Sequence, residues 1–156
     1  MTRAVPWLLV GLQFFLLIAL AVTALVPHDR LWALGLPAIV VGAVLVIGGA
    51  IVAVLGVVGL GPSLTASPVP KADNLLTTTG VYGLVRHPIY TGLLTGGLGL
   101  VALGASVLMI VFWIALLVLL AFKSRWEERM LSASHESYAE YGAHTGRFVP
   151  GVGRLR

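Results

Sequence analysis

The sequence predicts an all-α integral membrane protein with four transmembrane helices. Of its 156 residues, 58% are apolar and only 10% are charged, whereas a soluble domain usually carries about 25% charged residues. The apolar residues form four long runs separated by short polar segments or by one long loop. We expect a single membrane domain over residues 1–156, with spans at about 7–26, 31–60, 88–104 and 106–122.

The first span, residues 7–26, contains one amide, Gln13, and one hydroxyl, Thr23. Twenty apolar residues cross a hydrocarbon core of about 30 Å as a helix. A signal peptide is the competing interpretation, because Arg3 precedes the run. The apolar part of a signal peptide is only about 7–15 residues long, so we expect a retained span.

The second span, residues 31–60, has glycines at 35, 42, 49 and 56, a strict seven-residue step. Lipid tails are as apolar as leucine, so membrane helices associate where small residues allow close backbone approach. Glycine is also simply common in membrane helices, but this explains the number of glycines and not their phase. The step therefore predicts a helix–helix contact.

A long cytosolic loop, residues 61–86, is expected to join the second and third spans. Prolines at 62, 68 and 70 prevent a helix in its first part, and a loop of this length is more often functional than structural. The third span, residues 88–104, begins at Pro88, which suits the first helical turn. Gly92 and Gly96 give it a GxxxG pair.

The fourth span, residues 106–122, continues as a helical pattern into residues 123–131. Twenty-six residues from Ser106 reach about 39 Å, more than the hydrocarbon thickness. This helix should therefore project from the membrane and carry Glu127 and Glu128 to the start of the third span. Residues 131–144 then predict a short cytosolic C-terminal helix.

The distribution of charge predicts the orientation. With four spans, both termini and the long loop share one side, which receives nine of the ten basic residues. Arg30 alone lies on the other side. The positive-inside rule places the crowded side in the cytosol, most simply of the cell (inner) membrane.

Two polar clusters at the cytosolic level predict one ligand site. His87-Pro88 marks a helix N-terminus, which attracts an anion, and Arg86 adds a full positive charge. Glu127 and Glu128 supply the opposite sign, so a ligand with both an ammonium and a carboxylate suits the pair. The alternative is that these groups form ordinary surface ion pairs. The chain has no cysteine and no metal-binding constellation, so no metal site is expected.

The segment GVYGLVRHPIY (residues 80–90), followed by Glu127-Glu128-x-x-Leu131 and Tyr138-x-x-Tyr141, resembles the isoprenylcysteine carboxyl methyltransferase family and its phospholipid N-methyltransferase relatives. The resemblance covers about residues 60–150 and implies S-adenosyl-L-methionine as cofactor, bound by residues 62–90 and 123–150. The chain has Asn74 where the family usually has His, and Ser134-His135 where it has Phe-Gly. The resemblance assigns cofactor binding to Asn74, Leu75, Leu76, Thr77, Tyr82, His87, Pro88, Ile89, Tyr90, Glu127 and Glu128.

The predicted function is methylation of a lipid-like acceptor, first of all the carboxylate of an apolar acid. An anionic acceptor needs little acid–base help, only alignment in a dry site. We expect Arg86 and Tyr90 to act in catalysis, and Arg86 with Arg125 to bind the substrate. The alternative, methylation of a lipid amine, needs a proton acceptor, for which Tyr90, His135 and His144 are candidates.

Two other classes of protein remain as alternatives at this point. A membrane reductase of similar helical arrangement would bind NADPH, whose phosphates favour several basic residues over a pair of glutamates. A membrane scaffold without enzymatic activity would use its polar clusters only as anchors. Membrane lipids are expected partners and nucleic acids are not, while the oligomeric state is left open.

Overall fold

The computed structural model describes residues 4–26, 30–61 and 76–155. Within these ranges the chain is all-helical, as predicted, and one isolated bridge between Val85 and Gly146 is the only extended backbone pairing. The helices are α1 (Ala4–Leu25), α2 (Leu36–Leu60), α3 (Pro88–Gly104), α4 (Val107–Ser134) and α5 (Tyr138–His144), with a 3-10 turn, η2, at Gly80–Gly83.

Three of these helices, α1, α2 and α4, are long and apolar enough to cross a membrane. The fourth apolar helix, α3, has 17 residues. Lipid-facing side chains are exposed along the three long helices, among them Phe15 at 60% and Val44 at 63%. A protein that leaves such surface uncovered needs an apolar solvent around it, so the chain is an integral membrane protein.

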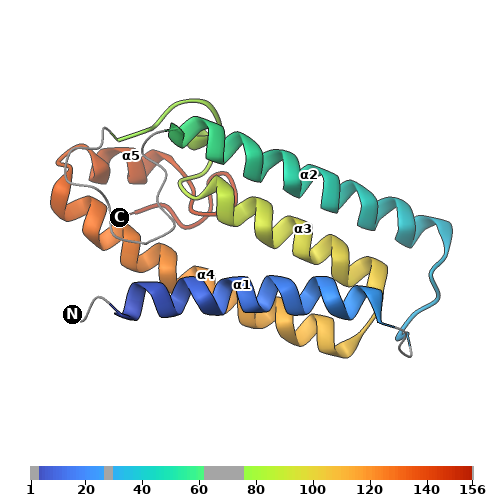
Figure 1. The fold of residues 1–156 in the computed structure, drawn as a ribbon. Coiled ribbons are helices and arrows are strands. Elements are labelled where there is room, and N and C mark those ends of the chain that lie inside the picture. The colour runs from blue at the N-terminus through green and yellow to red at the C-terminus, as the bar shows by residue number, and fades with distance from the viewer. Residues whose placement is uncertain (1–3, 27–29, 62–75, 156) are drawn as a thin grey trace.

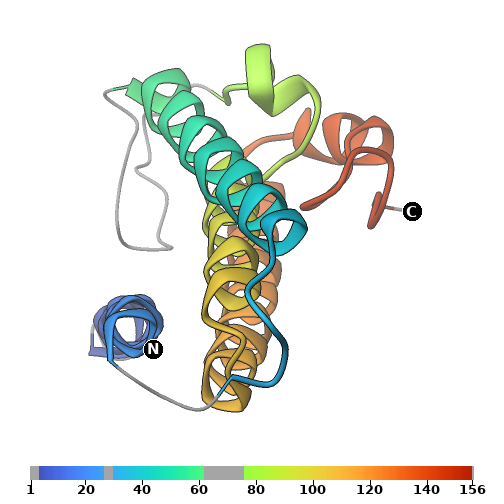
Figure 2. The same cartoon turned by 90° about the vertical axis from the view of Figure 1, so that its right-hand side faces the viewer.

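The four apolar helices α1, α2, α3 and α4 run alongside one another (Figure 1), and α3 contacts each of the other three. Figure 2 shows the same bundle turned by 90°. The helix α2 packs along α3, and α1 packs on α4 and α3. The end of α2, the start of α3, the end of α4 and α5 all lie at the same end of the molecule (Figure 1). α4 continues unbroken from Val107 to Ser134, so it carries Glu127 and Glu128 to that end.

The predicted glycine contact is confirmed for three of its four positions. Gly42, Gly49 and Gly56 are buried on α2, where they meet α3 at close range. A Cβ atom built on Gly49 would lie 2.6 Å from the carbonyl oxygen of Gly92. Gly35 was expected to join this contact and does not, because α2 begins at Leu36 and Gly35 caps it.

Gly49→Ala should therefore force α2 and α3 apart, because the added methyl group meets backbone that cannot rotate away. We expect a loss of about 1–3 kcal/mol, the usual cost of overpacking, seen as a lower thermal midpoint of the purified protein. Gly48→Ala is the matched control, since its Cβ would meet nothing within 4 Å. Equal midpoints for the two variants would contradict the assigned contact.

Candidate functional site

The candidate site forms where the C-terminal segment, residues 145–155, returns to the start of α3. The Arg86 backbone N–H donates to the Gly146 carbonyl at 2.8 Å, and that of His87 donates to the Arg147 carbonyl at 3.1 Å. One helical turn into α3, the Thr91 hydroxyl donates to the Phe148 carbonyl at 2.8 Å. The segment after α5 is therefore held against the start of α3 by two main-chain hydrogen bonds and one from the Thr91 side chain.

The guanidinium of Arg86 is buried, and all five of its N–H groups have partners. Its Nε and Nη2 both donate to Oε1 of Glu128, at 3.0 and 2.8 Å. The remaining donors reach the carbonyls of Gly142 (3.0 Å), Thr145 and Gly153 (2.8 Å). Arg86 thus joins α4 to α5 and to the segment that follows it, and its donor capacity is full.

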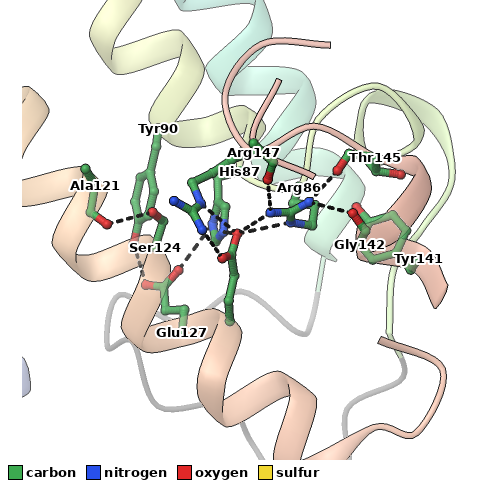
Figure 3. Close-up of polar contacts among 12 residues, drawn as sticks. Arg86, His87, Tyr90, Ala121, Ser124, Glu127, Tyr141, Gly142, Thr145 and Arg147 are labelled. Carbon is green, nitrogen blue, oxygen red and sulfur yellow. Dashed lines mark hydrogen bonds and ion pairs between the residues drawn. The ribbon is translucent and has the colours of Figure 1, made fainter. Parts of the chain in front are cut away.

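Glu128 is the centre of the charge cluster, because it contacts Arg86, His87 and Arg147. Figure 3 shows these three basic side chains close together, beside Tyr90 and Glu127. Arg147 approaches Glu128 as a fork, with Nε 3.0 Å from Oε1 and Nη2 2.6 Å from Oε2. The Nε2 atom of His87 lies 3.2 Å from Oε1. Three basic side chains, those of Arg86, His87 and Arg147, therefore surround this one carboxylate. Fork-shaped pairs of this kind are among the stronger hydrogen bonds in proteins.

The imidazole of His87 lies between the two adjacent glutamates. Its Nδ1 is 3.4 Å from Oε2 of Glu127, while its Nε2 faces Glu128. Burial lowers the pKa of His87, but the hydrogen bonds and charges of the two carboxylates outweigh it, so the pKa is raised above its ordinary value of 6.5. When the ring is protonated, both of its nitrogens carry a hydrogen, so it bridges the two carboxylates.

Glu127 has fewer polar contacts than Glu128 among the described residues. The Tyr90 hydroxyl donates to its Oε1 at 2.5 Å, and the Tyr90 ring stacks on His87 with centroids 5.5 Å apart. The Glu127 side chain is 18% exposed, compared with 5% for Glu128. Adjacent residues on one helix thus have different surroundings: Glu128 is enclosed by arginines, and Glu127 keeps acceptor capacity at the margin of the cluster.

The structure brings together five of the predicted site residues, from two distant parts of the chain. They are Arg86, His87, Tyr90, Glu127 and Glu128.

The other predicted residues lie around this cluster or apart from it. Tyr82 is buried, and its hydroxyl donates to the Gly56 carbonyl at 3.1 Å; Pro88 and Ile89 pack against the same end of α2. Leu76 and Thr77 are half-buried ahead of η2, while Arg125 is on the exposed side of α4 and does not join the cluster. Asn74 and Leu75 lie outside the described residues.

Arg147 was not among the predicted site residues and entered only as one of the nine basic residues expected on one side of the membrane. The burial of Lys123, which donates to Gln13 of α1 at 2.6 Å, was also not predicted. Neither the contact of Arg147 with Glu128 nor that of Lys123 with Gln13 can be predicted from the spacing of these residues in the sequence. Arg147 reaches Glu128 because the chain turns back after α5 and lies against the start of α3, where the Arg147 carbonyl accepts from the His87 backbone N–H at 3.1 Å.

The chemistry of this cluster fits a small ligand that carries a cationic centre. Glu127 offers a carboxylate with spare lone pairs, and the adjacent N-terminus of α3 suits an anionic group of the same ligand. In addition, the buried hydroxyl of Tyr138 has no hydrogen-bond partner among the described residues. The described residues contain no group of three or more His, Asp or Glu side chains that could hold a metal ion.

His87 gives the protein a measurable pH dependence. Since the pKa of His87 is higher in the folded protein, its contribution to stability is complete below pH 6.5 and is lost as the pH rises through the folded-state value. We expect the thermal midpoint of the wild type to fall over this range. His87→Gln should remove that part of the slope, and an identical slope in both proteins would exclude His87 as its source.

Comparison with known proteins gives two matches. A family model described as phospholipid methyltransferase matches residues 37–138, more than half of the chain. The cobalt-zinc-cadmium resistance protein CzcN of Cupriavidus metallidurans is 36% identical over 88 residues, which cover 55% of this chain and 40% of that protein. The aligned region thus spans less than half the length of this relative. No solved structure matches.

Proposed function

Because the chain belongs to the phospholipid methyltransferase family, we propose that it is a membrane methyltransferase that uses S-adenosyl-L-methionine to methylate a lipid-like acceptor. The observation that carries the proposal is the difference between the two glutamates. Glu128 is neutralised by two arginines, whereas Glu127 contacts Tyr90 and His87 among the residues described and keeps acceptor capacity for a cationic partner. A positively charged methyl donor is the ligand that such a carboxylate suits.

The cofactor would supply a methyl group on a positively charged sulfur, which leaves as a neutral thioether when the acceptor oxygen takes the methyl carbon. Glu127 orients the cationic end, with Tyr90 fixing the rotamer of its carboxylate. Arg86 and Arg147 hold Glu128 and the C-terminal segment, and so keep the wall of the site in place. Alignment of two bound partners and the exclusion of water supply the rate enhancement.

The carboxylate of an apolar acid is the first acceptor that we propose. An acceptor that is already an anion needs no base, and the acidic and basic side chains of the cluster already bond to one another. A lipid amine is the second candidate, favoured by one contact: the Tyr90 hydroxyl donates to Glu127, so a proton received by Tyr90 has a carboxylate to pass to.

Arg86 and Arg125, both predicted to bind the substrate, have different roles in the proposal. Arg86 has no spare donor, so direct binding of an anionic acceptor would require it to release a carbonyl of the C-terminal segment. We therefore propose that Arg86 supports catalysis by holding that segment. Arg125 is exposed on α4, where it is accessible to an anionic headgroup at the membrane surface.

We further propose that α3 is a fourth span and that the site faces the cytosol. At 1.5 Å per residue its 17 residues reach about 25 Å, which a short span achieves with local thinning of the bilayer. Four spans put both termini on the side that holds nine of the ten basic residues. Labelling of single cysteines, which the natural chain lacks, at positions 30 and 136 from either side of sealed vesicles tests this topology.

The proposed reaction is tested by incubating membranes that contain the protein with methyl-labelled S-adenosylmethionine and separated lipid fractions. We expect label in a lipid fraction, as a base-labile ester for a carboxylate acceptor or a stable amine for the second candidate. Glu127→Gln is the control for background methylation. Label found only in water-soluble products would exclude a lipid-like acceptor.

A further inference from the structure

A buried polar contact joins α1 to the candidate site. The Lys123 ammonium on α4 donates to Oε1 of Gln13 on α1 at 2.6 Å. The same ammonium lies 5.2 Å from the centroid of the Tyr90 ring, close enough for a cation–π interaction. Lys123 is only 1% exposed. One cation therefore connects α1 to the tyrosine that bonds to Glu127.

This contact lies deep in the apolar part of the molecule. Gln13 is near the middle of α1, twelve residues and about 18 Å from Leu25. A buried cluster of leucines, including Leu16 and Leu120, lies on the same two helices. Apolar residues in place of a buried polar pair commonly give equal or greater stability, and ionisable residues inside membrane helices usually have a function.

We propose that Gln13 is a positioning residue of the methyl-transfer site, an inference that rests on the proposed function. Gln13 holds the Lys123 ammonium against Tyr90 and away from Glu127, which leaves the Glu127 carboxylate available to the cofactor. The helix α1, outside the residues matched by the family model, is then part of the site and not only a membrane anchor.

The alternative position of the Lys123 ammonium, beside Glu127, follows from helix geometry. Residues 123 and 127 are four apart on α4, so a lysine and a glutamate there are neighbours on one face. Without the Gln13 acceptor, Lys123 has Glu127 as the strongest acceptor within reach. An ion pair between them would neutralise the carboxylate and compete with Tyr90 for it.

Titration of the purified full-length protein with S-adenosylhomocysteine tests this positioning role. Gln13→Leu should weaken binding about fivefold or more, because the freed ammonium turns to Glu127. Adding Lys123→Met removes that ammonium, and the double variant should recover to within about threefold of the wild type. Phe14→Leu, a change at a 54% exposed residue of the same turn, is the control and should leave binding unchanged.

Each outcome decides between the two proposals. Wild-type protein that binds no S-adenosylhomocysteine would refute the proposed function, and this inference with it. Normal binding by Gln13→Leu, or a double variant no better than the single one, would overturn the positioning role alone. If Gln13→Leu does not fold, Gln13→Asn replaces it. The asparagine side chain is one methylene shorter, so its carbonyl does not reach Lys123. Wild-type affinity in Gln13→Asn would equally overturn the positioning role.

Discussion

Glu128→Ala should destabilise the protein by about 3–5 kcal/mol, the cost of removing one partner from a buried charge cluster. Two arginines and a histidine would lose their common acceptor, with Arg86 fully enclosed. The C-terminal segment should also loosen, because Arg86 and Arg147 link it to α4 through this carboxylate. We expect a much lower thermal midpoint and cleavage by protease after α5.

Two further variants make this result specific. Glu136→Ala removes an exposed glutamate just beyond α4 and should change the midpoint little. Arg147→Ala combined with Glu128→Ala should cost less than the sum of the single losses, because neighbours in one network are not additive. Strictly additive losses would mean that the two residues do not interact as the structure has them.

Glu127→Gln should weaken S-adenosylhomocysteine and S-adenosylmethionine binding with little loss of stability. The expected loss is about 1–3 kcal/mol, or roughly 5- to 150-fold in affinity, as for removal of a buried charged partner. It should be larger for S-adenosylmethionine, whose sulfur carries a positive charge that the homocysteine compound lacks. Calorimetric titration of each ligand measures both losses.

Tyr90→Phe supplies the matched comparison, because it removes only the hydroxyl that donates to Glu127. Its effect on affinity should be smaller, and the double variant should lose less than the sum of the two single losses. Unchanged affinity in both single variants would show that the margin of the cluster around Glu127 is not where the cofactor binds.

Much of the fold could be predicted because membrane helices are set by local rules. The length of an apolar run, a proline in the first turn and a seven-residue glycine step each act within one helix or between neighbouring helices. For the same reason the extension of α4 beyond Phe122 was predictable. That extension brings Glu127 and Glu128 to the level of His87 and Tyr90.

The different surroundings of the two glutamates were not predictable. Adjacent residues on a helix point about 100° apart, so what each side chain contacts depends on how α4 is rotated in the bundle. That rotation is set by long-range packing, including the contact of Arg147 with Glu128 after a chain reversal. Lys123 was placed beyond the fourth span because the apolar run ends at Phe122, whereas in the structure α1 packs beside α4 and Lys123 is buried against Gln13.

Calorimetry of the purified wild-type protein with S-adenosylhomocysteine and, separately, with NADPH tests the central claim most directly. A membrane methyltransferase with its cofactor at Glu127 should bind S-adenosylhomocysteine at a single site, and Glu127→Ala should abolish or greatly weaken that binding. NADPH should give no heat of binding. Binding of NADPH without binding of S-adenosylhomocysteine, or tight S-adenosylhomocysteine binding that Glu127→Ala leaves unchanged, would contradict it.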